Sequence, residues 1–270
     1  MYNNNALLRR LGMALGLMAA SMMASADKAG KPNFLLIVAD DLGYSDIGAY
    51  GGEIETPSLD ALADEGIRMT NFHTAPTCSP TRSMLLSGTD SHQAGIGNMA
   101  ELLTAEQKGK PGYEGYLNDL VATLPEVLRD NGYSTSIAGK WHLGRTEELS
   151  PAVRGFDNSW VLVQGGASHF DDGRAIIGVD PKAIYLEDGK QVEAPEGFYS
   201  SDFYADKVIE YIDAAEEKPF FSFLAFTAPH WPLHAPESYI NKYEGRYGEG
   251  YEAIRKQRMG KMKEMGLIGP

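Results

Sequence analysis

The sequence has little cysteine, little positive charge and few long apolar runs, and each shortage excludes a class of protein. Cys78 is the single cysteine among 270 residues, so the chain cannot be a disulfide-stapled scaffold. The formal net charge is −13, and such an acidic surface repels nucleic acid and anionic membranes. An anionic substrate is repelled as well unless local cations or a metal ion receive it. Apolar residues still make up 43%, which is ordinary for a folded globular protein.

The one long apolar run lies near the N-terminus and predicts a secretory signal over residues 1–26. Arg9 and Arg10 provide a positive end, residues 11–23 an apolar stretch and residues 24–26 (Ala-Ser-Ala) a cleavage site. The stretch is shorter than the about 20 residues that span a bilayer. We therefore expect an exported protein, periplasmic or secreted, with no membrane association after cleavage.

Export makes the lone cysteine notable. Exported proteins usually pair their cysteines, so an unpaired Cys78 indicates a free, reactive thiol. The alternative is a buried cysteine that acts as a small apolar residue.

Short apolar runs alternate with helical patterns over the rest of the chain. Strands are predicted at 34–39, 134–138 and 220–226, and the unbroken apolar character of the first indicates a parallel sheet covered on both faces. Residues 145–200 are rich in Gly, Asp and Pro, and we expect excursions above the sheet there. This alternation of strand and helix patterns predicts an α/β doubly wound sheet with right-handed crossovers.

Four amphipathic or charged segments predict helices between and after these strands. Their ranges are 57–65, 124–130, 202–217 and about 249–264. Thr56 and Thr123 are the expected N-caps of the first two. The third is expected to bury Phe203, Val208, Ile209 and Ile212.

Polar residues follow directly on all three apolar strands. The first run ends in Asp40 and Asp41, the second leads into Lys140 and His142, and the third into His230. Ligands of an open parallel sheet bind beyond the carboxyl ends of its strands. We therefore expect these side chains to meet at one edge.

The adjacent carboxylates of Asp40 and Asp41 favour a hard cation. Two carboxylates about 4 Å apart repel by about 1–4 kcal/mol at effective dielectric constants of 80 to 20. Calcium or magnesium removes that penalty. Successive strand residues face opposite ways, so both reach one ion only where the chain turns, and Gly43 can supply the turn. The alternative is that one or both cap a loop.

Residues 78–82 (Cys-Ser-Pro-Thr-Arg) predict the start of a helix, because proline is favoured in the first helical turn. Free N–H groups and the helix dipole at that point attract an anion. Arg82 lies one turn after Cys78 on the same face and can reach the same anion. The alternative is a helix start with an incidental cysteine.

Lys140 and His142 are two residues apart, so an extended backbone would present both side chains on one side. His230 follows its strand in a proline-rich loop. The remaining histidines are interpreted as structural residues: His73, His92, His169 and His234.

These residues together resemble the site segments of type I sulfatases, most closely the bacterial arylsulfatases. The Cys-x-Pro-x-Arg signature of that family corresponds to residues 78–82, and its second signature to residues 139–144 (Gly-Lys-Trp-His-Leu-Gly). The Asp40-Asp41 strand end and the Ala-Pro-His segment at 228–230 are similar to its other site segments. All four occur in the order of the family, over residues 32 to 270.

The resemblance implies an alkaline-phosphatase-like α/β fold, with a mostly parallel sheet and helices on both faces. It also implies that a formylglycine-generating maturation enzyme oxidises Cys78 to Cα-formylglycine. The hydrated aldehyde has two hydroxyls, so one can attack sulfur and the other can then eject sulfate. The implied substrate is a small-molecule or glycan sulfate ester.

The resemblance also assigns a role to each site residue. It implies that Asp40, Asp41 and residue 78 hold calcium, with magnesium the less favoured ion. Arg82 would stabilise the formylglycine and Lys140 would bind sulfate oxygens. His142 would accept the proton that drives sulfate release, and His230 would assist the leaving oxygen as an acid.

The sequence departs from the family in one respect. Type I sulfatases are longer and supply an Asp-Asn pair and another lysine from a later segment, and nothing after His230 matches these. Residues 27–270 are therefore expected to be an N-terminal catalytic domain that lacks the last strands and the small C-terminal domain, with little activity alone. The other readings are a phosphate or phosphonate ester hydrolase of the same superfamily and an inactive sulfatase fragment.

Overall fold

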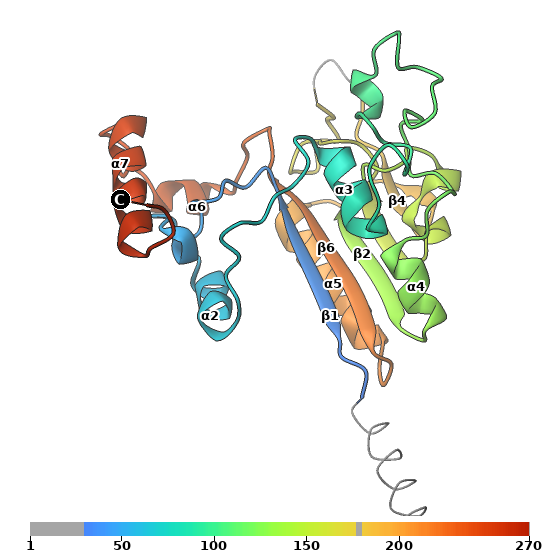
Figure 1. The fold of residues 1–270 in the computed structure, drawn as a ribbon, viewed down its shortest axis with the longest axis horizontal. Helices are drawn as coiled ribbons and strands as arrows, with labels where there is room; N and C mark the ends of the chain where they lie inside the picture. The colour runs from blue at the N-terminus through green and yellow to red at the C-terminus, as the bar shows by residue number, and fades with distance from the viewer. Residues whose placement is uncertain (1–29, 177–179, 270) are drawn as a thin grey trace, which may run out of the picture.

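The computed structural model of the chain describes residues 30–176 and 180–269 (Figure 1). The predicted signal segment, residues 1–26, lies outside the described residues. The strands of the described part are β1 (Phe34–Asp40), β2 (Ser134–Lys140), β3 (Asn158–Leu162), β4 (Tyr185–Glu187), β5 (Lys190–Val192) and β6 (Phe220–Pro229). They form one sheet in the order β1-β6-β2-β3-β4-β5. The pairs β1/β6, β6/β2 and β2/β3 are parallel, and β3/β4 and β4/β5 are antiparallel.

Helices lie on both faces of this sheet. The α-helices are α2 (Pro57–Glu65), α3 (Cys78–Ser87), α4 (Leu124–Asp130), α5 (Ser200–Ala214), α6 (Glu237–Lys242) and α7 (Tyr251–Glu264). The short 3₁₀ turns are η1 (Gly48–Tyr50), η2 (Ala100–Leu102), η3 (Glu147–Leu149) and η4 (Pro151–Val153). Figure 1 shows α5 behind the sheet, with α3 and α4 on its other side. The predicted mostly parallel α/β sheet with helices on both faces is confirmed.

Alternate residues of the central strands supply two hydrophobic cores, because successive strand side chains point to opposite faces. On the face of α3 and α4, Phe221 and Phe223 of β6 belong to the same buried cluster as Leu86 of α3. On the face of α5, Leu224 of β6 joins Tyr204 of α5 in the second cluster. Burying a large apolar side chain contributes about 1.5–3 kcal/mol. The two cores therefore fix the central strands whose ends carry the polar motif residues.

The helix predictions were accurate in position and less so in detail. The helix at 124–130 has the expected cap, since the Thr123 hydroxyl accepts a hydrogen bond from the Glu126 N–H while the Glu126 carboxylate accepts one from the Thr123 N–H. Thr56 does not cap α2 through its side chain. Its hydroxyl instead accepts a hydrogen bond from the Gly48 N–H, which holds η1.

The prediction that Ile209 lies on the buried side of α5 was wrong. It is 57% exposed, whereas Tyr204, Val208 and Tyr211 are buried. These three follow the spacing i, i+4, i+7 of one helix face. Ile209 is the next residue after Val208, about 100° further round the helix, and faces solvent.

The prediction of mere excursions over residues 145–200 was also wrong. That stretch contains β3, β4 and β5, which extend the sheet by one parallel and two antiparallel pairings. Trp160 of β3 is 3% exposed and stacks against Tyr185 of β4 with ring centroids 4.7 Å apart. Asp188 and Gly189 form the hairpin turn between β4 and β5 with φ of 48° and 79°. An Asp-Gly pair is a strong hairpin signal, so the sequence did carry the information.

The strand β1 lies at the edge of the sheet and is only partly covered. Leu36 and Val38 pack against the first core, but Leu35 and Ile37 on the other side are 49% and 44% exposed. The expectation that both faces are covered was therefore wrong for this strand. In Figure 1, α2, α6 and α7 lie beyond β1, away from the rest of the sheet. Over residues 30–176 and 180–269, none of the helices combines the length and the hydropathy required to cross a bilayer.

Candidate active site

The register of the sheet brings Asp40 and His230 to one edge. Asp40, the last residue of β1, pairs with Pro229 of β6, so His230 follows directly at the same level. Asp41 has a left-handed backbone, with φ of 66°, and the chain leaves the sheet there. The turn that was expected from Gly43 thus begins at Asp41 itself. Asp40 is 6% exposed and points inward, whereas the side chain of Asp41 is 60% exposed.

Cys78 is the first residue of α3, as its sequence predicts, and is half-buried. One turn later, the guanidinium of Arg82 is buried and makes two contacts. It donates to the backbone carbonyl of Lys140 over 2.8 Å and to Asp40 Oδ1 over 3.2 Å. Arg82 therefore ties the helix that begins at Cys78 to the ends of β1 and β2.

The ammonium of Lys140 is completely buried and pairs with Asp40. Its Nζ lies 2.5 Å from Asp40 Oδ2. Burial alone would raise the pKa of Asp40, but the charges of Arg82 and Lys140 outweigh it and lower that pKa. Asp40 is thus a buried carboxylate held between two cations. Removing one member of such a cluster is costly, since the others are left with uncompensated charge.

Gly139 explains how β2 can deliver Lys140 to this place. Its φ is +122°, a conformation that L side chains rarely adopt. A Cβ on Gly139 would lie 1.8 Å from the carbonyl oxygen of Ala225 in β6. Only glycine fits between the two strands at this point, immediately before the buried lysine.

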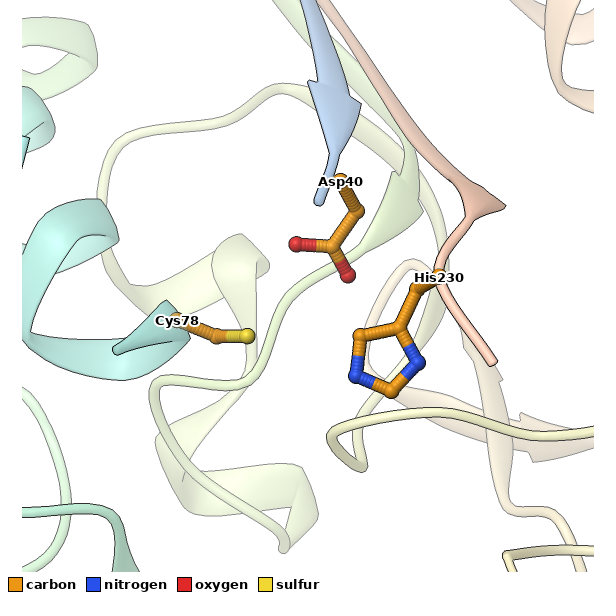
Figure 2. A group of neighbouring side chains, drawn as sticks. All are labelled: Asp40, Cys78 and His230. Atoms are coloured by element: carbon orange, nitrogen blue, oxygen red, sulfur yellow. The ribbon is translucent and has the colours of Figure 1, made fainter. Parts of the chain in front are cut away.

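Asp40, Cys78 and His230 converge from three separate segments (Figure 2). A carboxylate oxygen, the Sγ and a ring nitrogen of these residues lie within 4.8 Å of one another. Asp41 joins them at their exposed side, because its Oδ2 lies 3.6 Å from His230 Nε2. Carboxylate, thiol and imidazole groups at such distances can hold a cation or act together on a bound anion.

His142 lies off the extended part of β2. The strand ends at Lys140, and His142 has a left-handed backbone with φ of 54°, so the expected alternation does not extend to it. The Nε2 of His142 lies 2.8 Å from Oε1 of Glu101. Lys140 and His142 thus have different partners, the first Asp40 and the second Glu101.

Two adjacent glycines that the sequence analysis did not single out connect the two predicted catalytic histidines. A Cβ on Gly165 would lie 2.8 Å from Cε1 of His142. A Cβ on Gly166 would lie 3.3 Å from Cε1 and Nδ1 of His230. The backbone at 165–166 therefore runs close to both rings and brings His142 into the neighbourhood of His230.

His169, predicted to be structural, supports the loop of His230. Its Nδ1 lies 2.7 Å from the Ser200 hydroxyl and its Nε2 3.2 Å from the His230 carbonyl oxygen. Burial lowers the pKa of His169. The neutral ring can donate to the His230 carbonyl and so fix the backbone that carries His230.

The structure thus brings Asp40, Cys78 and His230 together, with Arg82 and Lys140 bonded to Asp40. His142 bonds to Glu101 and is connected to this group through the backbone at 165–166. The electrostatic arrangement suits an anion, because Arg82 and Lys140 both contact Asp40, an oxygen of which lies within 4.8 Å of Cys78 Sγ at the N-terminus of α3. The residues that sequence reasoning missed are Glu101, Gly165 and Gly166. A Gly-Gly pair is a signal of close backbone approach, but nothing in the local sequence distinguishes Glu101 from a surface acid.

Comparison with known proteins identifies the class that this fold and site define. The sulfatase family model matches residues 32–265, and the chain belongs to that family. An uncharacterised sulfatase from Schizosaccharomyces pombe is 52% identical over 248 residues, covering 88% of this chain. An arylsulfatase from Klebsiella aerogenes is 44% identical over 247 residues, covering 91%.

Solved structures agree with this assignment. The crystal structure of Ps i-CgsB in complex with a neocarrahexaose superposes with a TM-score of 0.69 at 28% identity and covers 88% of this chain. That of BT4656 with its substrate D-glucosamine-2-N,6-O-disulfate gives 0.61 at 27% identity over 80% of this chain. The chain spans about half the length of the relatives it matches, 45% of the yeast protein and 53% of the Klebsiella enzyme.

Proposed function

We propose that the chain carries the nucleophile half of a sulfatase active site, which hydrolyses sulfate esters through formylglycine made from Cys78. The observation that carries this proposal is the convergence of Asp40, Cys78 and His230 within 4.8 Å, with Arg82 and Lys140 bonded to Asp40. Family membership supports sulfate ester hydrolysis as the reaction. The two solved relatives bound to a carrageenan-type oligosaccharide and a sulfated glucosamine favour a sulfated glycan as substrate, and the Klebsiella arylsulfatase favours an aryl sulfate.

The donor chemistry of the site supports oxidation of Cys78 before metal binding. Calcium prefers carboxylate, carbonyl and water oxygens, whereas thiolate sulfur suits softer metals. Asp40 and Asp41 supply oxygens, but Cys78 supplies sulfur at the same point. Conversion to formylglycine replaces that sulfur with oxygen, so the three residues then fit a calcium ion. Magnesium, which demands a stricter octahedron, fits less well.

The hydrated aldehyde supplies a nucleophilic hydroxyl and a second hydroxyl that later releases sulfate. Around it, each residue has a stated task. Lys140 stabilises the negative charge of the sulfate group, and Arg82 stabilises negative charge on residue 78. His142 accepts a proton from residue 78, and His230 donates one to the leaving oxygen. Electrostatic stabilisation by the fixed cations is the largest contribution, because both are buried and already ordered.

The donor count supports a further expectation. Asp40, Asp41 and residue 78 offer about three or four oxygens, whereas calcium takes six to eight. We therefore expect calcium to bind weakly to this chain and turnover by the chain alone to be slow. The export signal predicted at residues 1–26 supports periplasmic or secreted action.

Mass spectrometry of residue 78 tests the proposal directly. After co-production with a formylglycine-generating enzyme, the peptide that contains residue 78 should be about 18 Da lighter than its cysteine form, as expected for loss of H₂S and gain of oxygen. The Ser79→Ala chain is a matched control with the thiol intact, and Cys78→Ala should show no mass change. A peptide that keeps its full cysteine mass in every preparation would overturn the formylglycine proposal.

The substrate class is tested with paired aryl esters. The converted chain is incubated with calcium and either an aryl sulfate or the corresponding aryl phosphate. We expect any turnover to favour the sulfate and to disappear in Cys78→Ala. Preference for the phosphate would show that the site belongs to the phosphatase branch of the superfamily.

A further inference from the structure

A carboxylate–imidazole pair joins His142, the proposed proton acceptor, to Glu101, a partly buried residue to which no role has been given so far. Glu101 comes from η2, and its Oε1 lies 2.8 Å from Nε2 of His142. The His142 side chain is 5% exposed and that of Glu101 17%. Burial would raise the pKa of Glu101, but the hydrogen bond and the charge of His142, together with weaker contacts, outweigh burial and lower that pKa to about 2. Glu101 is therefore ionised at neutral pH and can only accept a hydrogen bond.

The two ring nitrogens of His142 have different surroundings. Because an ionised carboxylate has no proton to donate, the nitrogen that faces Glu101 must carry one. The other nitrogen, Nδ1, is buried and has no hydrogen-bond partner in the described residues. A buried polar atom without a partner is costly, which is a sign that something else occupies its bonding position during function.

Close packing keeps the ring in this orientation. A Cβ on Gly165 would lie 2.8 Å from Cε1 of His142, 3.0 Å from its Nε2 and 3.0 Å from Glu101 Oε1. The backbone of Gly165 therefore lies against the edge of the ring that bonds Glu101. A turned ring would lose that bond and leave a partly buried carboxylate without its partner, which is unfavourable.

We propose that Glu101 is a positioning residue that holds His142 in its Nε2–H form, so that Nδ1 is the atom that accepts a proton from residue 78. The proposal rests on the role given above to His142. In the proton transfer, the hydroxyl of residue 78 loses its proton to the Nδ1 lone pair, and the proton on Nε2 stays in its bond to Glu101. The ring becomes an imidazolium whose charge the carboxylate balances, and Glu101 remains ionised throughout.

This arrangement explains why an acidic residue, Glu101, lies close to a site that is proposed to bind the sulfate group of the substrate. A buried imidazolium without a partner would be strongly disfavoured, and the chain would lose its proton acceptor. A carboxylate on the far side of the ring stabilises the charged form and selects the tautomer. It does so without facing the substrate, because the bond to Nε2 directs it away from Nδ1.

Nitrogen-15 NMR of the histidine rings tests the proposal without any need for turnover. The six histidines are labelled, and the His142 signals are assigned from their loss in His142→Gln. At a pH where the ring is neutral, the wild-type chain should show a protonated Nε2 and an unprotonated Nδ1. In Glu101→Gln the amide can donate to Nε2, so the ring should shift to the Nδ1–H form or to a mixture.

Two further variants make the result specific. Glu147→Gln breaks an exposed pair with Lys190, 3.2 Å apart, and should leave the His142 signals unchanged. Glu101→Asp keeps a carboxylate and should recover part of the Nε2–H preference. The same tautomer in Glu101→Gln as in the wild type would overturn the proposal. If Glu101→Gln does not fold, the wild-type spectrum decides, and an Nδ1–H ring there overturns it. If the ring has the Nε2–H form but Cys78 is never converted to formylglycine, the proposed function fails and the role of Glu101 in fixing the tautomer stands.

Discussion

The central sheet and the helices beyond β1 are built in different ways. In the first region, β2, β3 and β6 are sandwiched between α3 and α4 on one face and α5 on the other, with two buried clusters. In the second region, called here the outer helices and consisting of α2, α6 and α7, the described residues include no buried side chain. The contrast separates parts of the chain that carry their own core from parts that do not.

Ion pairs and hydrogen bonds, rather than a core, attach the outer helices to the segment after β1. Arg258 of α7 bonds to Glu53 and Asp46, and Lys242 of α6 bonds to Glu55. A hollow of about 890 Å³ lies between α7 and that segment. Large apolar side chains remain exposed in the outer helices and near them: Leu62, Ile67, Phe72 and Ile240.

The proposed active site lies at the boundary between the two regions. Lys140 is the last residue of β2 in the well-packed sheet and His142 comes just after it, whereas Asp40 is the last residue of the partly covered edge strand β1 and Asp41 comes just after it. The position of Lys140 is therefore fixed by the hydrophobic core of the central sheet, whereas the positions of the two carboxylates depend on the partly exposed edge strand β1.

The largest expected effect comes from deleting a side chain of the central core. Phe223 of β6 is 1% exposed, so Phe223→Ala should lower the free energy of unfolding by about 3–5 kcal/mol. The matched change in the outer helices is Ile240→Ala in α6, where the side chain is 59% exposed and the expected change is within about 0.5 kcal/mol. Urea unfolding followed by circular dichroism measures both. Similar losses in the two variants would mean that the outer helices have a core of their own.

Local patterns predicted what depends on neighbours in sequence. The capping box of α4 was predictable because Thr123 and Glu126 are three residues apart, and the start of α3 because Pro80 fixes the first turn. The strand ends were predictable because apolar runs stop abruptly at polar residues. The site residues followed from that edge rule and from the motif resemblance together.

Long-range pairing was much harder to predict. The bond between Glu101 and His142 joins residues 41 apart, and no local pattern marks Glu101 as its partner. Strand β3 was missed because its burial depends on β2 and β4, and not on a period of its own. The exposure of Leu35 and Ile37 was missed because an apolar run shows that a strand can be covered, and not that a helix covers it.

The second expected effect compares one type of ion pair in the two regions. Lys140→Met removes a fully buried partner of Asp40 and should cost about 3 kcal/mol or more, because the carboxylate stays buried beside Arg82 alone. Lys242→Met breaks the exposed pair with Glu55, 2.8 Å long, and should cost less than about 1 kcal/mol. Chemical denaturation at low and high salt measures the difference, and salt should weaken only the exposed pair. Equal costs for the two lysines would contradict the distinction between the regions.

The smallest expected effect concerns the attachment of α7 and its dependence on pH. The bond to Arg258, together with other contacts, lowers the pKa of Glu53 from 4.5 to about 2 despite partial burial. A carboxylate with a lowered pKa stabilises the folded form above its unfolded value and loses that contribution as the pH falls. The attachment of α7 should therefore weaken between pH 4.5 and about 2. Because ion pairs near the protein surface are worth about 0.2–1 kcal/mol, local opening should rise by a factor of roughly 1.4 to five.

Amide hydrogen exchange of α7, referred to that of α5 in the same sample, detects this opening. Arg258→Gln should raise the exchange of α7 at pH 6 to the level that the wild type reaches in acid, and should remove most of the pH dependence. Arg255→Gln is the control, since among the described residues the ion pair of Arg255 is with Glu252 of the same helix. If the amides of α7 in Arg258→Gln remained as protected from exchange as those of α5, then α7 would be held by packing and not by its ion pairs. The contrast between a core-built sheet and charge-attached outer helices would then fail at α7.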